Sequence, residues 1–135
     1  MIQSFHKLTG GTDTTPRAIL RADSVFEIAL GLALVACAAA SLLGAGDFPS
    51  PVGASLVAVF GIALLPIGAL LWRLSLGPVP AGLLRTLAAA NLATGTAALA
   101  WRLAAAGFST TGSALTIATA AALALLAAAQ LRASA

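Results

Sequence analysis

Four long apolar runs, separated by short polar breaks, dominate the pattern of this 135-residue chain. The runs cover residues 25–43, 52–72, 87–106 and 113–131. Each run is rich in Ala and Leu, lacks strand-like alternation, and is of the roughly 17 to 25 residues that cross a hydrocarbon core. Backbone polar groups in lipid must be satisfied within the segment itself, so the pattern predicts four transmembrane helices.

The polar breaks between the runs have the composition of turns. Residues 44–51, 73–85 and 107–112 are rich in Gly, Pro, Ser or Thr. Such short connections make consecutive helices antiparallel neighbours. The predicted fold is therefore an all-α, four-helix transmembrane bundle over residues 23–135, preceded by a polar cytoplasmic tail over residues 1–22.

Composition and charge agree with a membrane protein and indicate its orientation. Hydrophobic residues make up 60% of the chain and charged residues only 8%, against about 25% charged in a typical soluble domain. Basic residues mark the cytoplasmic side of short loops, and here one side holds Lys7, Arg17, Arg21, Arg73, Arg85 and Arg132. The other side holds only Arg102. We therefore expect a bacterial inner-membrane protein with both termini cytoplasmic, and no nucleic-acid partner, because the basic residues form no patch.

The two halves of the chain resemble each other. Residues 20–31 and 84–95 both read Leu-Arg, five residues, Glu or Asn, three residues, Gly. Residues 53–56 and 112–115 are also alike. The chain thus looks like a tandem duplication of a two-helix hairpin, which makes Glu27 equivalent to Asn91.

Glu27 and Asn91 are the polar residues that we expect to meet across the first and third helices. Each lies six residues inward from an arginine, about 9 Å at the helical rise. Gly31 and Gly95 follow four residues later on the same helix face, where a small residue lets a neighbouring backbone approach.

Two interpretations of Glu27 stay open. In the structural one, Glu27 is neutralised by a proton, by Arg21 or by Arg85, and its hydrogen bond to Asn91 stabilises the bundle by about 0.6 to 2 kcal/mol. In the functional one, Glu27 is a proton or cation site that is emptied and filled during transport. Gln130, near the end of the last run, is interpreted as interfacial.

The remaining candidates concern helix shape and anchoring. Pro66 removes a backbone hydrogen bond inside the second run and predicts a kink, with Gly61 and Gly68 nearby as packing positions. Trp72 and Trp101 stand beside arginines at helix ends, where an indole serves as an interfacial anchor.

Leu34-Val35-Ala36-Cys37 has the form of a bacterial lipobox. Cleavage there would need an unusually long leader with Glu27 inside its apolar region, which argues against processing. Cys37 is interpreted as a helix-packing residue, and as the only cysteine it cannot form an intrachain disulfide.

The chain lacks the residue groups on which enzymes depend. His6 is the only histidine, so no histidine pair for haem and no metal-binding spacing exists. The four acids are scattered, at Asp13, Asp23, Glu27 and Asp47. We therefore expect no enzymatic activity, no cofactor and no metal site.

The stretch from Arg21 to Gly31, the third run with Asn91, and the four-span length resemble small Ala-rich four-helix membrane proteins of bacteria, and loosely the DoxX-like proteins. The resemblance implies the fold and no activity. Four spans with an acid in the first also resemble small multidrug-resistance transporters, in which that Glu binds protons and cationic drugs. This chain departs from them in having no Tyr, only two Trp, both interpreted as interfacial, and a long polar tail. Without Tyr or an interior Trp, the aromatic lining for a cationic drug is missing.

Taken together, these features favour a non-enzymatic accessory or interaction protein in the lipid bilayer, acting with a membrane-protein partner or as a homo-oligomer. The alternative is a proton- or cation-coupled transporter of a small molecule that uses Glu27. A transporter requires a water-accessible cavity that reaches Glu27, whereas an accessory protein requires a dry interior and a specific lateral partner.

Overall fold

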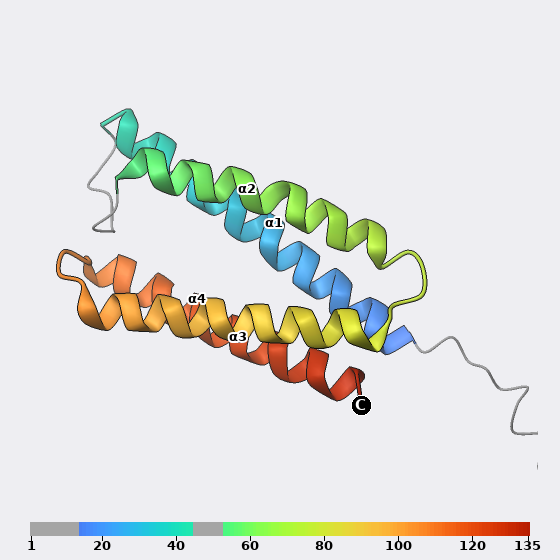
Figure 1. Ribbon diagram of the computed structural model, residues 1–135. Helices are drawn as coiled ribbons and strands as arrows, with labels where there is room; N and C mark the ends of the chain where they lie inside the picture. Colours follow the sequence, from blue (N-terminus) through green and yellow to red (C-terminus); the bar gives the residue numbers. More distant parts are fainter. Residues whose placement is uncertain (1–13, 45–52) are drawn as a thin grey trace, which may run out of the picture.

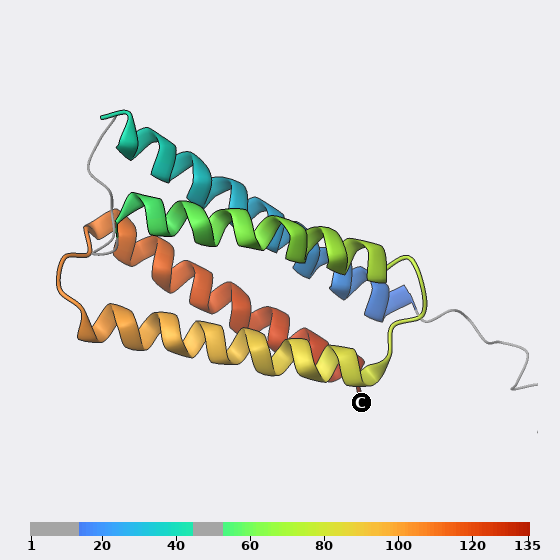
Figure 2. The same ribbon diagram turned by 45° about the horizontal axis from the view of Figure 1, so that its top comes forward.

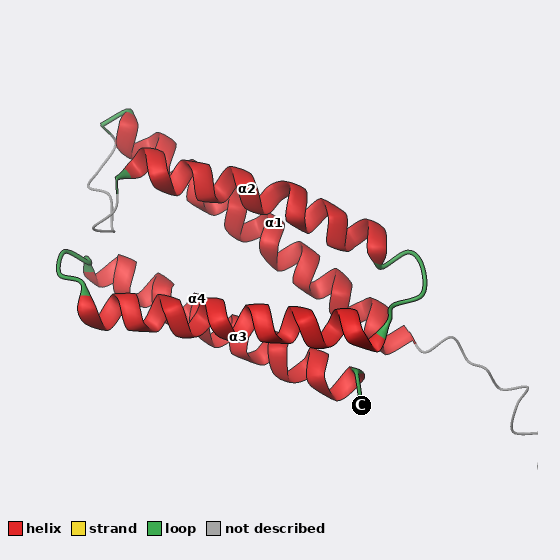
Figure 3. Ribbon diagram, viewed as in Figure 1, coloured by secondary structure: helices red, strands yellow, loops and turns green. Residues whose placement is uncertain are grey.

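A computed structural model describes residues 14–44 and 53–135, which form four α-helices and no strands. The helices are α1 (Thr14–Leu42), α2 (Ala54–Leu74), α3 (Ala81–Ala104) and α4 (Thr110–Ala133). Figure 3 shows the short loops that join α2 to α3 and α3 to α4. The predicted all-helical fold is therefore confirmed for the described part of the chain.

Helix α1 begins at Thr14, well before the first apolar run. Residues 14–22, predicted as tail, are thus helical; the rest of that tail, residues 1–13, lies outside the described residues. Hydropathy marks the length of chain that matches lipid and does not mark where a helix starts. Pro16 lies in the first turn, where its missing N–H interrupts no helical hydrogen bond.

Local sequence explains where the other helices begin and end. Gly44 after α1 and Gly107 after α3 have φ of 76° and 96°, a left-handed conformation that glycine adopts without strain. The Ser109 side chain accepts a hydrogen bond from the Gly112 N–H at 3.0 Å and caps α4. Pro80, in an extended conformation, precedes α3.

Helices α1 and α2 form a closely packed hairpin. A Cβ atom built on Gly31 would lie 2.7 Å from the Gly61 carbonyl oxygen, and one built on Gly61 would lie 2.7 Å from the Gly31 carbonyl oxygen. Further along, the Ser24 hydroxyl donates to the Gly68 carbonyl at 2.7 Å. The two backbones therefore touch without intervening side chains, as small residues permit in membrane helices.

Helices α3 and α4 form a second hairpin with looser packing. A Cβ on Gly95 would lie 3.4 Å from the Ala120 carbonyl oxygen, at ordinary contact distance. The buried side chains of this hairpin are mostly small or aliphatic: Leu84, Ala88, Ala120, Leu123 and Ala127.

The two hairpins meet mainly where α1 packs against α4. In Figure 1 and Figure 2, α1 and α4 lie closest at the end where α1 begins and α4 ends, and these two helices diverge toward the opposite end. The junction between the hairpins is thus the place where residues from three helices can come together.

Three helices are long and apolar enough to cross a membrane: residues Thr15–Leu42, Ala54–Leu74 and Thr110–Ala133. Helix α3 is 24 residues long but less apolar, since it carries Arg85, Asn91 and Arg102, and it is not among them. Large apolar side chains are exposed on all four helices, for example Leu32, Phe60, Leu103 and Leu125. Such an extensive apolar surface suits a lipid environment.

Candidate functional site

A buried polar cluster joins the two hairpins. It consists of Asp23 from α1, Asn91 from α3 and Gln130 from α4, whose exposed fractions are 1%, 6% and 0%. Buried polar groups of this kind are costly unless they are hydrogen-bonded to one another. These three residues are therefore the first candidates for a specific role.

Hydrogen bonds connect each member of the cluster to both others. The Gln130 amide donates from Nε2 to Asp23 Oδ2 at 2.6 Å. The Asn91 amide donates from Nδ2 to Gln130 Oε1 at 3.1 Å and to Asp23 Oδ2 at 3.4 Å. Asp23 Oδ2 thus accepts two N–H groups, whereas its other oxygen, Oδ1, is buried with no hydrogen-bond partner among the described residues.

The helices bring these residues together because each stands on a buried face. Asp23 lies beside the buried Leu20 and Ser24 on α1, and Asn91 continues the buried positions Leu84 and Ala88 on α3. Gln130 lies in the last turns of α4, which pack against α1. Gln130 was expected to be interfacial rather than buried, and this expectation was wrong about burial, because helix packing covers the side chain completely.

Glu27 lies one helical turn beyond Asp23 on α1 and is half-buried. Its oxygen Oε2 is buried and has no hydrogen-bond partner in the described chain. Asn91, the expected partner of Glu27, instead donates to Asp23 and Gln130. The reason is that α1 packs against α4 at the junction, so that Asn91 reaches α1 at the level of Asp23.

The two arginines expected to neutralise Glu27 have other partners. Arg21 donates from Nε to the Ser75 hydroxyl at 3.4 Å, and its guanidinium carbon lies 5.6 Å from the centre of the Trp72 ring. Arg85 donates from Nη2 to the Ser134 carbonyl at 3.0 Å. No basic side chain of the described residues forms an ion pair with Asp23 or Glu27.

The other predicted positions lie away from the cluster. Trp101 packs edge-on against Phe108, with ring centroids 4.7 Å apart, near the end of α3. Helix α2 continues unbroken through Pro66, so the kink stays a prediction. Cys37 is exposed on α1.

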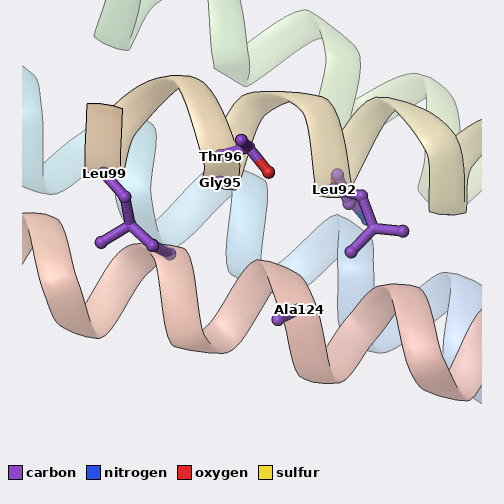
Figure 4. A pocket seen from close by; sticks show the side chains of 7 residues that line it. Leu92, Gly95, Thr96, Leu99 and Ala124 are labelled. Atoms are coloured by element: carbon purple, nitrogen blue, oxygen red, sulfur yellow. The ribbon is translucent and has the colours of Figure 1, made fainter. Parts of the chain in front are cut away.

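A small hollow borders the cluster on the side of α3 and α4. Its volume is about 80 Å³, and Figure 4 shows the side chains that line it: Asn91, Leu92, Gly95, Thr96, Leu99, Ala120 and Ala124. The lining is apolar except for Asn91 and Thr96. Typical small-molecule sites measure about 300 to 1,000 Å³, so this hollow is too small for an organic substrate.

Metal chemistry finds no support in the part of the chain that the structure covers. Within residues 14–44 and 53–135, no group of three His, Cys, Asp or Glu side chains gathers as metal ligands would. Two threonine hydroxyls donate to the backbone of their own helix, Thr86 to the Gly82 carbonyl and Thr116 to the Gly112 carbonyl.

Sequence reasoning named Asn91 and missed Asp23 and Gln130 as its partners. A signal for Asp23 was present, because Asp23 and Glu27 are spaced to share one helix face. Gln130 carried no such signal, since its burial depends on which helix packs against α4.

Comparison of the chain with protein-family models, with curated proteins and with solved structures gives no match in any of the three.

Proposed function

We propose that this chain is a non-enzymatic accessory or interaction protein of a bacterial inner membrane, with four spans and both termini cytoplasmic. The observation that carries the proposal is the junction between the hairpins. One buried polar cluster ties α1 to α3 and α4, while large apolar side chains stay exposed on every helix. Such a molecule offers broad lateral surfaces for other membrane helices.

The fourth span in this proposal is α3. Its 24 residues extend about 36 Å at the helical rise, enough for a bilayer core. Asn91, its central polar residue, is buried against the cluster and so is shielded from lipid. Arg85 and Arg102 stand toward its two ends, where long basic side chains reach the interface.

Contacts that recur in both hairpins support a tandem duplication. Arg21 bonds to Ser75 across the first hairpin, and Arg85 bonds to Ser134 across the second. Both serines also donate their hydroxyls to a carbonyl three residues earlier, Ser75 to Trp72 and Ser134 to Leu131. Residues aligned by the sequence repeat thus make similar contacts in the two halves.

Photocrosslinking in native membranes tests lateral association directly. A photoreactive residue at Leu125 on α4 or at Phe60 on α2, which are 73% and 60% exposed, reports what lies beside each helix. We expect a discrete protein adduct from at least one of the two positions. The matched control is Leu123 on α4, which is 3% exposed and should give no intermolecular adduct. Lipid adducts alone at both exposed positions would contradict the proposal.

Transport is the second candidate function, and the unpartnered carboxylate oxygens of Asp23 and Glu27 favour it. It requires a water path to Glu27. In a Cys37→Ser background, a cysteine at position 27 should react with a membrane-impermeant charged thiol reagent if such a path exists. The accessory function predicts protection of that cysteine, with a cysteine at the exposed Leu43 as the reactive control.

A further inference from the structure

The described acids of α1 stand together without a cation. Asp23 and Glu27 are one helical turn apart on the same face. Asp23 is 1% exposed, and Asp23 Oδ1 and Glu27 Oε2 are both buried without a hydrogen-bond partner. Two ionised carboxylates in this position would repel each other in a medium that screens charge poorly.

The basic side chains of the surrounding helices leave this charge uncompensated. Arg21 of α1 is directed to Ser75 and Trp72, and Arg85 of α3 to Ser134. Arg73 of α2 and Arg132 of α4 are exposed, and neither forms an ion pair with the two acids. Gln130 and Asn91, which contact Asp23, are uncharged. Some other positive species must balance the pair.

The free acceptors suit a proton better than a metal ion. Mg²⁺ and Ca²⁺ require about six to eight oxygen ligands, whereas the described residues offer two free carboxylate oxygens here. A proton requires only one oxygen to carry it and one to accept the hydrogen bond. Asp23 Oδ2 already accepts two amide N–H groups, so Asp23 Oδ1 is the oxygen left to accept a hydrogen bond from a proton carried by Glu27.

We propose that Asp23 and Glu27 form an intramembrane proton-binding site that holds one exchangeable proton between Glu27 Oε2 and Asp23 Oδ1. The proton comes from water and returns to it, and no other bond forms or breaks. Occupancy of the site leaves one negative charge on the pair, whereas its release leaves two charges beside the junction. Because Asp23 joins α1 to both α3 and α4, proton release places a second negative charge one helical turn from the residue that connects the hairpins. This site goes beyond the accessory function and does not depend on it: a proton needs only brief water contact at the half-buried Glu27, and not the open path for a charged reagent that transport requires.

Infrared spectroscopy of the full chain in lipid nanodiscs tests the proposal, since a protonated carboxyl group absorbs apart from an ionised one. Near neutral pH we expect a signal equivalent to one protonated carboxyl per chain, which disappears on titration to alkaline pH. Glu27→Gln should reduce it to background, while Asp47→Asn, which removes one of the other acids of the chain, should leave it unchanged. Absence of the signal in the native chain, or its persistence in Glu27→Gln, would overturn the proposal.

A thermal unfolding series across pH provides a second readout that needs no spectral assignment. A proton held in the folded state and released on unfolding stabilises the protein at low pH, and this stabilisation is lost as pH rises. We expect the native unfolding temperature to fall with rising pH through the neutral range, and that of Glu27→Gln to stay flat there. Glutamine has nearly the size of glutamate and keeps an N–H donor for Asp23 Oδ1, so the variant should fold. Superimposable profiles would contradict a shared proton.

Discussion

At the scale of single residues, the Asp23–Asn91–Gln130 cluster is the most specific feature of the molecule. Its bonds link residues that are 39, 68 and 107 positions apart in the chain. Interhelical bonds between polar side chains in membranes contribute modestly, because the unfolded chain in the membrane also finds polar partners. The cluster therefore determines which helices meet more than it determines the total stability.

A double-mutant cycle measures the coupling inside the cluster. We expect Asn91→Ala and Gln130→Ala each to lower the free energy of unfolding, with a coupling energy of about 0.6 to 2 kcal/mol between them. Reversible unfolding in mixed detergent micelles supplies the four free energies. The exposed Leu131 provides a control through Asn91→Ala combined with Leu131→Ala, which should be additive. Additive effects of the Asn91 and Gln130 changes would show that the bond contributes nothing.

The sequence predicted these residues unevenly. Asn91 was identifiable as a polar residue inside an apolar run, but its partner depends on helix arrangement. Glu27 matched Asn91 in depth through the repeat, whereas Asp23 aligns with an apolar residue, Leu87, and so the repeat gave no reason to choose it. Side-chain pairing across helices is a tertiary property that periodicity does not contain.

At the scale of helices, the contrast between the two hairpins is the main finding. Gly31 and Gly61 bring two backbones together, whereas the repeat-related contact of Gly95 with Ala120 leaves room for a methyl group. The same substitution should therefore have opposite effects at aligned positions of the two halves.

Gly31→Ala and Gly95→Ala test this contrast. A Cβ at residue 31 would lie 2.7 Å from a backbone oxygen, an overpacked contact that costs about 1 to 3 kcal/mol. At residue 95 the nearest atom is 3.4 Å away, so alanine should be neutral or should stabilise by up to about 1 kcal/mol through helix propensity. The measured change in the free energy of unfolding should be a loss of stability for the first variant and none, or a gain, for the second. Equal effects at both positions would show that α1 and α2 do not pack through their glycines.

Helix number and order were predictable from the sequence, and helix ends were not. The four apolar runs each correspond to one helix, since a run of lipid length has only the helical solution. Helix α1 extends back to Thr14 and α3 to Ala81, because residues outside the lipid-matching part can continue a helix. The turn residues Gly44 and Gly107, which have positive φ, are the first residues of the predicted breaks 44–51 and 107–112.

At the scale of the whole molecule, an even number of spans requires both termini on one side. Reporter fusions should therefore show the N- and C-termini both in the cytoplasm, as the arginine distribution predicts. A fusion after Gly77, in the loop between α2 and α3, should also be cytoplasmic, and one after Gly107 should be outside. Termini on opposite sides would mean that α3 does not cross the membrane.

The polar junction holds the two hairpins in one arrangement, and a distance between α1 and α4 reports whether it does. Spin labels at the exposed positions Val25 and Leu125, in a Cys37→Ser background in nanodiscs, report that distance by double electron–electron resonance. We predict one narrow distribution for the otherwise native chain, which broadens when Gln130→Ala removes the bonds to Asp23 and Asn91. A distribution that is already broad, or one that Gln130→Ala leaves unchanged, would contradict a junction held by this cluster.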